Sequence, residues 1–313
     1  MNKNAILLIL LLVLGVGAWF SYQHNSRKST LNKLDLNFSV SDTASIDKIL
    51  IEPIIGERAE LIRQKNGGWI LNGKYKVAPV LMDVLLTTIR NVEMLRPLSA
   101  KEGATALESM EKRGRKVSIY VGGNLYKSYR LGDDAPGNKG TYLQLEDGNP
   151  YVAYLRGFNG FLSPRYDVSS NEWRDRLLFS SNPSSIRSVE VRYTRMPLES
   201  FRLELNGNLT MEAATRFDTA EAASVLGSFR GVYIERFLDR LPKQKRDSLL
   251  SAGCEWSLEL VDENSALSNK LELFLTSDPD RSLAYLPRTK EWVTIQNRNL
   301  YPVMRRRSDL LNP

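Results

Sequence analysis

The sequence of this chain resembles itself at a shift of about 140 residues, and this feature constrains the fold more than any other. Residues 45–51 (SIDKILI) align with residues 185–191 (SIRSVEV), and both segments alternate apolar and polar side chains as half-buried strands do. Residues 84–92 (VLLTTIRNV) align with residues 224–232 (SVLGSFRGV), where the apolar positions have helical spacing instead. A chain of 313 residues is long enough for two domains, so we expect each half to form one copy of a single module.

Each copy reads as strand, strand, helix, short helix and then about four strands. The short helices are predicted over residues 104–113 and 245–252, and Asn-Gly, Asp-Gly and Gly-Gly pairs mark the hairpin turns. Antiparallel strands with one amphipathic helix favour an α+β fold. We therefore predict two tandem homologous modules, each a mainly antiparallel sheet with one amphipathic helix and one short helix. The first module is expected over residues 31–178 and the second, a degenerate repeat, over residues 179–313.

The first thirty residues predict a location at a membrane. Residues 5–20 form an uncharged run, AILLILLLVLGVGAWF, within a stretch about as long as a helix that crosses the hydrocarbon of a bilayer. A cleaved signal peptide is the alternative, although its apolar region is shorter and ends at a small-residue site. We expect residues 1–30 to be a membrane anchor or uncleaved signal, with a transmembrane helix in the bacterial inner membrane over residues 5–22. Residues 30–313 would then lie in the periplasm.

The composition excludes several classes of function. The chain has one Cys and one His, which are too few for an intrachain disulfide or a structural zinc site. The single histidine, His24, lies beside the predicted membrane segment, so no Ser-His-Asp triad is expected in the body of the chain. The net charge of +7 lacks the basic stripe with aromatics that is typical of nucleic-acid binders. We predict no enzyme, no cofactor, no metal site and no nucleic-acid partner.

Several short motifs follow one another through the first copy. They are Leu131-Gly132, Ala135-Pro136, Gly140-Thr141-Tyr142, Tyr151-Val152 and Trp173-Arg174-Asp175-Arg176. Their order resembles the bacterial domain-of-unknown-function family 4340 over most of residues 38–178. The second copy lacks the Leu-Gly and Gly-Thr-Tyr motifs. The resemblance implies a membrane-anchored extracytoplasmic protein that accompanies gliding-type ABC transporter components, and it brings no catalytic residues with it.

Two functions from different classes are consistent with these features. The first is a non-enzymatic, membrane-anchored scaffold or accessory subunit of an ABC-type transporter or a gliding or envelope assembly, with transmembrane proteins of the transporter as its partners. The second is an envelope ligand-binding module for glycan, peptide or lipid that uses the groove between the two modules.

The densest polar segment is the loop over residues 132–140. Asp133, Asp134, Asn138 and Lys139 could together bind a cation or a polar ligand. The loop lacks the alternating carboxylates of a calcium loop, and its glycines do not have the spacing of a phosphate loop. A purely structural hairpin loop is the other interpretation.

Four arginines repeat at the same shift as the strands. Arg90 and Arg230 occupy the same helix position in the two copies, and Arg96 and Arg236 are also 140 residues apart. Their stems could cover apolar surface while the guanidinium groups cap helix ends or pair with carboxylates. The alternative is a repeated surface that faces a partner protein.

Overall fold

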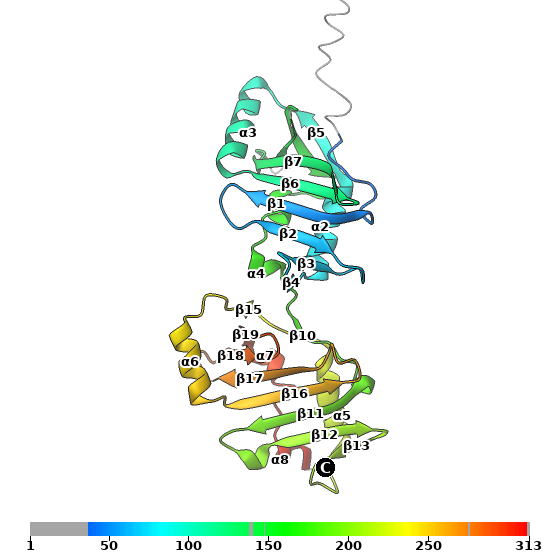
Figure 1. Cartoon of the computed structure of the whole chain (residues 1–313), viewed down its shortest axis with the longest axis vertical. Coiled ribbons are helices and arrows are strands. Elements are labelled where there is room, and N and C mark those ends of the chain that lie inside the picture. The colour runs from blue at the N-terminus through cyan, green and yellow to red at the C-terminus, as the bar shows by residue number, and fades with distance from the viewer. Residues whose placement is uncertain (1–36, 138–139, 147, 275, 312–313) are drawn as a thin grey trace, which may run out of the picture. The chain divides into compact units, whose positions relative to one another are not determined.

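A computed structural model describes residues 37–137, 140–146, 148–274 and 276–311 (Figure 1). Their contacts divide the chain into two compact units, of which the first ends at Arg174 and the second begins at Asp175. This boundary lies a few residues before the one expected from the sequence, which followed residue 178. Trp173 is buried in the core of the first unit and Phe179 in the core of the second, so the connection between the two cores is short.

The first unit is built on one antiparallel sheet of nine strands in the order β4-β3-β2-β1-β6-β7-β8-β9-β5. The strands are β1 (Ile46–Pro53), β2 (Ala59–Arg63), β3 (Trp69–Leu71), β4 (Tyr75–Lys76), β5 (Val92–Pro97), β6 (Arg115–Val121), β7 (Asn124–Asp134), β8 (Thr141–Leu145) and β9 (Pro150–Leu155). The helices are α2 (Pro79–Asn91), α3 (Ala100–Arg113), η1 (Ser163–Arg165) and α4 (Ser170–Trp173).

The second unit has an eight-stranded antiparallel sheet in the order β13-β12-β11-β16-β17-β18-β19-β15, and a small sheet of β10 and β14. The strands are β10 (Leu177–Phe179), β11 (Ile186–Tyr193), β12 (Phe201–Asn206), β13 (Asn208–Met211), β14 (Val232–Tyr233), β15 (Arg236–Phe237), β16 (Trp256–Asp262), β17 (Asn269–Phe274), β18 (Arg281–Leu286) and β19 (Glu291–Gln296). The helices are η2 (Pro183–Ser185), η3 (Pro197–Glu199), α5 (Thr219–Gly227), η4 (Ser228–Arg230), α6 (Lys243–Ala252), α7 (Asn297–Leu300) and α8 (Arg307–Leu311).

The two large sheets arrange their strands alike. In each, the first strand lies between its hairpin partner and the strand that follows the second helix. A strand that comes between the two helices in the chain, β5 or β15, closes the far edge. Even an irregularity recurs, because the register of β1 on β6 shifts after Ile46 and that of β11 on β16 shifts after Ile186. The internal repeat itself stays a prediction from the sequence.

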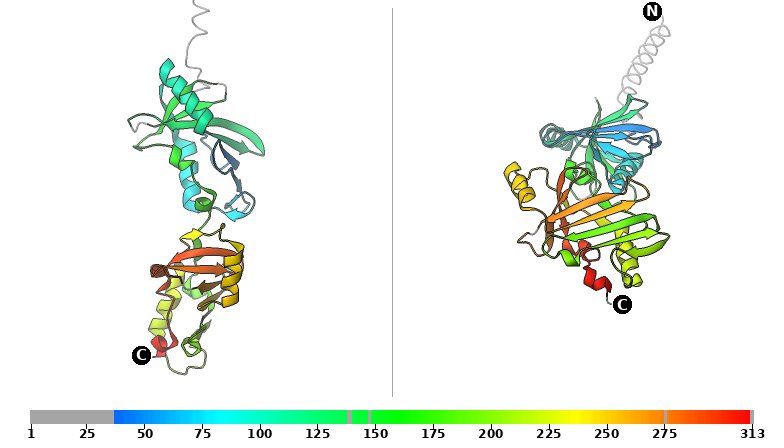
Figure 2. Two further views of the ribbon diagram at one scale, coloured as in Figure 1. Left: turned by 90° about the vertical axis from the view of Figure 1, so that its left-hand side faces the viewer. Right: turned by 60° about the horizontal axis from the view of Figure 1, so that its bottom comes forward.

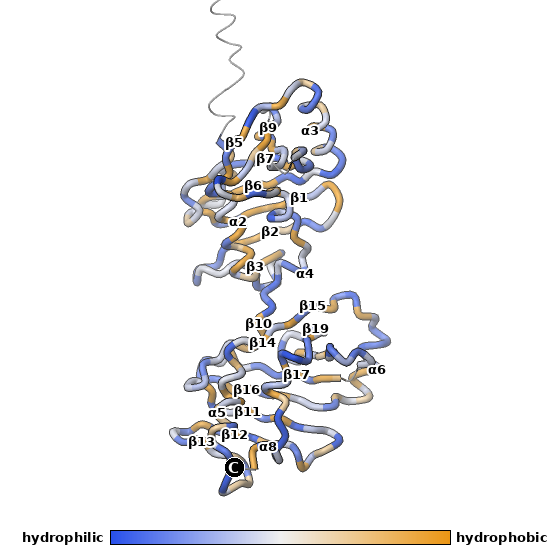
Figure 3. Tube along the Cα trace, turned by 180° about the vertical axis from the view of Figure 1, so that it is seen from behind, coloured by the Kyte–Doolittle hydropathy of each residue, from blue (hydrophilic) through white to orange (hydrophobic). Residues whose placement is uncertain are grey.

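In the first unit, the two main helices cover opposite faces of the sheet. Successive side chains of a strand point to opposite faces. Leu143 of β8 packs in the large core with Leu85 and Ile89 of α2, whereas its neighbour Tyr142 packs in a smaller cluster with Met110 of α3. The sheet is therefore apolar on both faces near β8 and β9. Figure 3 shows the apolar colour concentrated along the strands and the polar colour at the loops.

The second unit follows the same plan with α5 and α6. Val293 of β19 belongs to the core that contains Val225 of α5, while the adjacent Trp292 packs with Phe274 and Leu249 of α6 on the opposite face. The left view of Figure 2 shows the two helices on either side of the strands. One face of each sheet thus carries the main core, and the other is covered only at one end.

Local sequence signals explain where the main helices begin. Pro79 occupies the first turn of α2, where its missing N–H removes no hydrogen bond from the helix. Asp218 caps α5, because its Oδ1 accepts from the backbone N–H groups of Ala220 at 2.9 Å and Glu221 at 3.0 Å. Both signals lie within a few residues of the helix start.

The predicted fold class is wrong. The structure consists mostly of antiparallel sheet, in three sheets and with few helices, rather than two α+β modules behind a membrane helix. Strand prediction from alternation needs about four to eight residues. Strands of two or three residues, such as β4, β10, β14 and β15, give no such signal, and with them the sequence missed the full extent of the sheets.

The predicted transmembrane helix is also corrected. Within residues 37–311, apart from the short gaps named above, no helix is long and apolar enough to span a membrane. The longest, α2 and α3, have 13 and 14 residues, or about 20 Å, against the roughly 30 Å of a bilayer's hydrocarbon. This finding contradicts the single-pass inner-membrane location with residues 30–313 in the periplasm. The predicted helix, residues 5–22, and the anchor region, residues 1–30, lie outside the described residues.

Two tyrosines form a buried polar contact inside the otherwise apolar core of the first unit. The hydroxyl oxygens of Tyr129 and Tyr166 lie 3.0 Å apart, and the two rings meet edge to face. Both side chains are almost completely buried. Burial raises the pKa of each hydroxyl, so both stay protonated and one donates to the other.

We expect the two tyrosines to show strong coupling in a double-mutant cycle. Tyr166→Phe alone leaves the Tyr129 hydroxyl buried without a partner and should cost about 1–3 kcal/mol of unfolding free energy. The double variant Tyr129→Phe/Tyr166→Phe removes both hydroxyls and should cost less than either single variant. Hydrogen exchange of the β7 and β8 amides measures the stability of this unit. Additive costs in the double variant would contradict the pairing.

Candidate functional site

The loop over residues 132–140 is held to the rest of the first unit by its aspartates. Asp133 forms an ion pair with Arg113 at the end of α3, and its backbone N–H donates to Ser109 Oγ at 3.0 Å. Asn138 and Lys139 lie outside the described residues. At Gly140, a Cβ would lie 2.2 Å from the carbonyl oxygen of Ala153, so the loop ends where two backbones approach closely.

Asp134 organises a second set of contacts. One of its carboxylate oxygens accepts from Thr141 Oγ1 and from Ser163 Oγ, both at 2.7 Å. Thr141 Oγ1 in turn accepts from the backbone N–H of Leu162 at 2.8 Å. Asp134 therefore fastens the segment before η1 to the β7–β8 hairpin. The contacts of both aspartates are those of a structural loop, and binding of a cation or polar ligand there stays a prediction.

The two arginines of the first unit have partners within it. Arg90, near the end of α2, donates to Thr43 Oγ1 at 2.7 Å. Arg96, on the edge strand β5, makes a bidentate contact with Glu102 of α3 at 2.7 and 2.8 Å. The hydrogen bonds from Arg96 are the main reason why the pKa of Glu102 is lowered. These contacts link β5 to α3.

The corresponding arginines of the second unit are different. Arg230 ends η4 much as Arg90 lies near the end of α2, but Arg236 begins β15 opposite Thr294 of β19. Arg96 lies near the end of β5 opposite Val152 of β9. Arg230 and Arg236 are both exposed, and neither side chain forms a hydrogen bond or ion pair with another described residue. The repeated position thus does not mean a repeated contact, and a partner-facing role stays a prediction.

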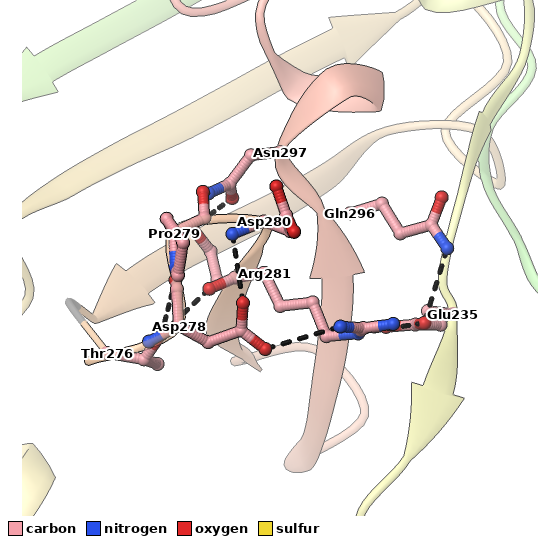
Figure 4. A network of polar contacts seen from close by, with 9 residues as sticks. Glu235, Thr276, Asp278, Pro279, Asp280, Arg281, Gln296 and Asn297 are labelled. Carbon is pink, nitrogen blue, oxygen red and sulfur yellow. Dashed lines mark hydrogen bonds and ion pairs between the residues drawn. The ribbon is translucent and has the colours of Figure 1, made fainter.

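A network of polar contacts occupies one end of the sheet in the second unit (Figure 4). Arg281 and Gln296 are register partners at the end of the β18–β19 pair, and Glu235 directly precedes β15 on the other side of β19. Arg281 Nε lies 2.9 Å from one carboxylate oxygen of Glu235 and 3.0 Å from the other, and Gln296 Nε2 donates at 3.2 Å. Arg281 also pairs with Asp278 at 3.3 Å. The edge strand is fastened to the sheet through these side chains.

Electrostatics in this network favour the ionised carboxylates. Burial alone would raise the pKa of Glu235, but the hydrogen bonds from Gln296 and Arg281 outweigh it, and the pKa is lowered. The pKa of Asp278 is lowered chiefly by the backbone N–H of Asp280. Both groups are therefore anions near neutral pH. They have the character of structural ion pairs rather than of an acid–base pair poised for catalysis.

A pocket lies at the end of the last long strand of each sheet. In the second unit it has a volume of about 280 Å³ and is lined by Asp280, Arg281, Gln296, Asn297, Arg298 and Tyr301. In the first unit it has a volume of about 490 Å³ and is lined by Thr87, Asn91, Glu93, Leu155, Arg156, Gly157, Phe158 and Arg165. A glutamate at the sheet edge also recurs, because Glu93 of β5 accepts from Arg156 at 3.1 Å and Glu235, just before β15, accepts from Arg281.

Sequence reasoning missed these pockets. Arg156 directly follows strand β9, and Gly157 and Gly160 lie on either side of Phe158, but such a pattern is shared by most hairpin loops. The residues that meet Arg156 and Arg165 come from α2 and β5, more than sixty positions earlier in the chain. Only the folded sheet brings them together.

A further cavity of about 500 Å³ lies on the polar face of the second sheet, where Glu190, Arg192 and Arg202 contribute to its lining. Its charged side chains pair with one another, as in the contact of 2.6 Å between Arg192 and Glu190. Within the described parts of the chain, no group of three or more His, Cys, Asp or Glu side chains could hold a metal ion.

The first hairpin of each unit ends in exposed apolar side chains. In the β1–β2 turn, Ile54 is 60% exposed and Ile55 is 75% exposed. Between β11 and β12, Leu198 is 90% exposed, beside the less exposed Met196. We call these two turns the hairpin tips. Single apolar side chains on a surface are ordinary, but neighbouring ones at the corresponding turn of both units are a candidate contact surface.

Comparisons with models of protein families, with curated proteins and with solved structures find no match to this chain.

We expect the Glu235 network to give the second unit a pH-dependent stability. Because the pKa of Glu235 is lower in the folded chain, its contribution is complete above the unfolded pKa of about 4.3 and is lost as the pH falls through the folded value. Glu235→Gln should cost about 0.5–1.5 kcal/mol at neutral pH, a modest value because Arg281 is 45% exposed.

Urea denaturation of wild type and variant at neutral and acidic pH measures this effect. The difference in unfolding free energy should shrink below about pH 4. Glu263→Gln, at an exposed turn of the same unit, is the control and should leave the unfolding free energy unchanged at either pH. A Glu235→Gln cost that persists unchanged in acid would contradict the assignment.

Proposed function

We propose that this protein is a non-enzymatic scaffold or accessory subunit that binds a partner protein through its hairpin tips. The observation that carries the proposal is the near-complete exposure of Leu198, together with that of Ile55 at the corresponding turn of the first unit. Exposed large aliphatic side chains cost free energy in water that is recovered when a partner covers them.

The expected strength of such binding follows from the size of these side chains. Burying one leucine or isoleucine contributes about 1.5–3 kcal/mol. Part of this gain offsets the loss of translational and rotational freedom on association. One tip alone would therefore bind weakly, whereas a partner that contacts both tips would bind more tightly.

The resemblance of the first unit to the domain-of-unknown-function family 4340 supports a particular partner. It implies a subunit of an ABC-type transporter as the protein that the scaffold accompanies. A scaffold in this sense needs a stable sheet and accessible turns, and it needs no cluster of reactive groups.

Photo-crosslinking tests the proposal directly. A photoreactive phenylalanine analogue at position 55 or 198 should crosslink in cells to a subunit of an ABC-type transporter. The same analogue at position 80 is the control, because Val80 on α2 is 71% exposed, close to the 75% of Ile55. Crosslinking from position 80 equal to that from positions 55 and 198 would count against the hairpin tips.

Substitution of the tips gives a second readout. Ile55→Ser/Leu198→Ser should reduce co-purification of the crosslinked subunit by about tenfold or more, since the loss of about 1.4 kcal/mol corresponds to a factor of ten. Val80→Ser should leave co-purification unchanged. Undiminished co-purification with a folded double variant would contradict the proposed function.

A further inference from the structure

The pocket of the first unit contains an arginine without an acidic partner. Arg165, in η1, is half-buried and lines the pocket of about 490 Å³ at the end of β9. Its Nη1 donates to Thr88 Oγ1 of α2 at 3.2 Å. No carboxylate of the described residues pairs with it. A guanidinium has five N–H groups, so most of its donors remain for the pocket and for water.

An aromatic ring orients this guanidinium. The Cζ atom of Arg165 lies 4.3 Å from the centroid of the Phe158 ring. An arginine over a ring face keeps the N–H groups in its own plane, where they can form hydrogen bonds. The ring is held from another side by Gly160, at which a Cβ would lie 2.9 Å from Phe158 Cζ. Phe158 and Arg165 are thus positioned before any ligand arrives.

The other charged groups of the pocket leave it suited to an anion. Glu93 is the only acidic residue that lines it among the described residues, and its carboxylate already accepts from Arg156 at 3.1 Å and from Tyr154 Oη at 3.2 Å. The charge of Arg165 is therefore not compensated within the pocket. The walls add apolar surface from Leu155 and from Phe158, which is 38% exposed.

We propose that this pocket binds a ligand with a free carboxylate next to an apolar group, which Arg165 holds by a bidentate contact while the apolar group packs on Phe158. The planar fork of a guanidinium matches a carboxylate, and the pocket has room for a ligand of this size. This binding is separate from the contacts proposed for the hairpin tips.

The corresponding pocket of the second unit provides an internal contrast. It is smaller, at about 280 Å³, and Asp280 lines it beside Arg298. Arg281, its other arginine, is already engaged by Glu235 and Asp278. A carboxylate would meet a like charge there, so we expect binding in the first unit and not in the second.

The test is a ligand-observed NMR titration of the full chain with N-acetylphenylalanine. We expect a dissociation constant of roughly 1 mM, in keeping with a ligand of about fifteen non-hydrogen atoms. N-acetylphenylalanine amide, which lacks the carboxylate, should bind at least about tenfold more weakly. Arg165→Met should weaken binding of the acid by a similar factor, and Arg298→Met should change it by less than about twofold.

A second substitution separates binding from folding. Arg165→Lys retains the positive charge but lacks the fork, and it should also weaken binding of the acid while the thermal unfolding of the chain stays close to that of wild type. Equal binding of the acid and the amide would overturn the proposal, as would binding that Arg165→Met leaves intact. Inorganic phosphate that binds through Arg165 in preference to the carboxylate would overturn the assigned ligand class.

Discussion

The structure of both units depends on the alternation of side chains along antiparallel strands. Each side chain of a strand points to one face of the sheet or the other. Wherever an apolar side chain points to a face, that face must be covered to bury it. Near β8 and β9 the sequence places apolar side chains on both faces, with Leu143 against α2 and Tyr142 against α3. A second helix is needed there, and α3 supplies it, as α6 does in the second unit. The remainder of that face stays polar, as antiparallel sheets allow.

Polar side-chain contacts support the edge strands of both large sheets. The two edge strands differ, because β5 pairs with β9 through five residues whereas β15 pairs with β19 through two. Side chains reinforce these edges, through Arg96 with Glu102 in one unit and Arg281 with Glu235 in the other. The pocket of the second unit lies beside the contact of Arg281 with Glu235, and the pocket of the first unit lies beside the contact of Arg156 with Glu93. Arg165 differs from Arg96, Arg156 and Arg281 because an aromatic ring and a hydroxyl, rather than a carboxylate, hold it in place.

The sequence predicts a structural feature when the residues that form it are close together in the chain, and it fails when they are far apart. Strand β1 is encoded within a few residues by alternation and was predicted. The start of helix α5 is encoded as locally, by the cap at Asp218. The edge strand β15 has two residues, and its partner Glu235 meets Arg281 across 46 positions. No local pattern encodes that contact. For the same reason, composition indicates a candidate site in the loop over residues 132–140, whereas no local sequence pattern indicates the pocket around Arg165.

The short connection between the units has a consequence for any partner. Trp173 still belongs to the first core, and β10 of the second unit begins at Leu177. Because both units belong to one chain, binding of a second contact surface after the first is an intramolecular step. Two weak contact surfaces carried in this way can act as one bivalent ligand, provided that the partner presents matching sites within reach. A longer connection would then lower the effective concentration for binding through the second unit, without changing the residues of either contact surface.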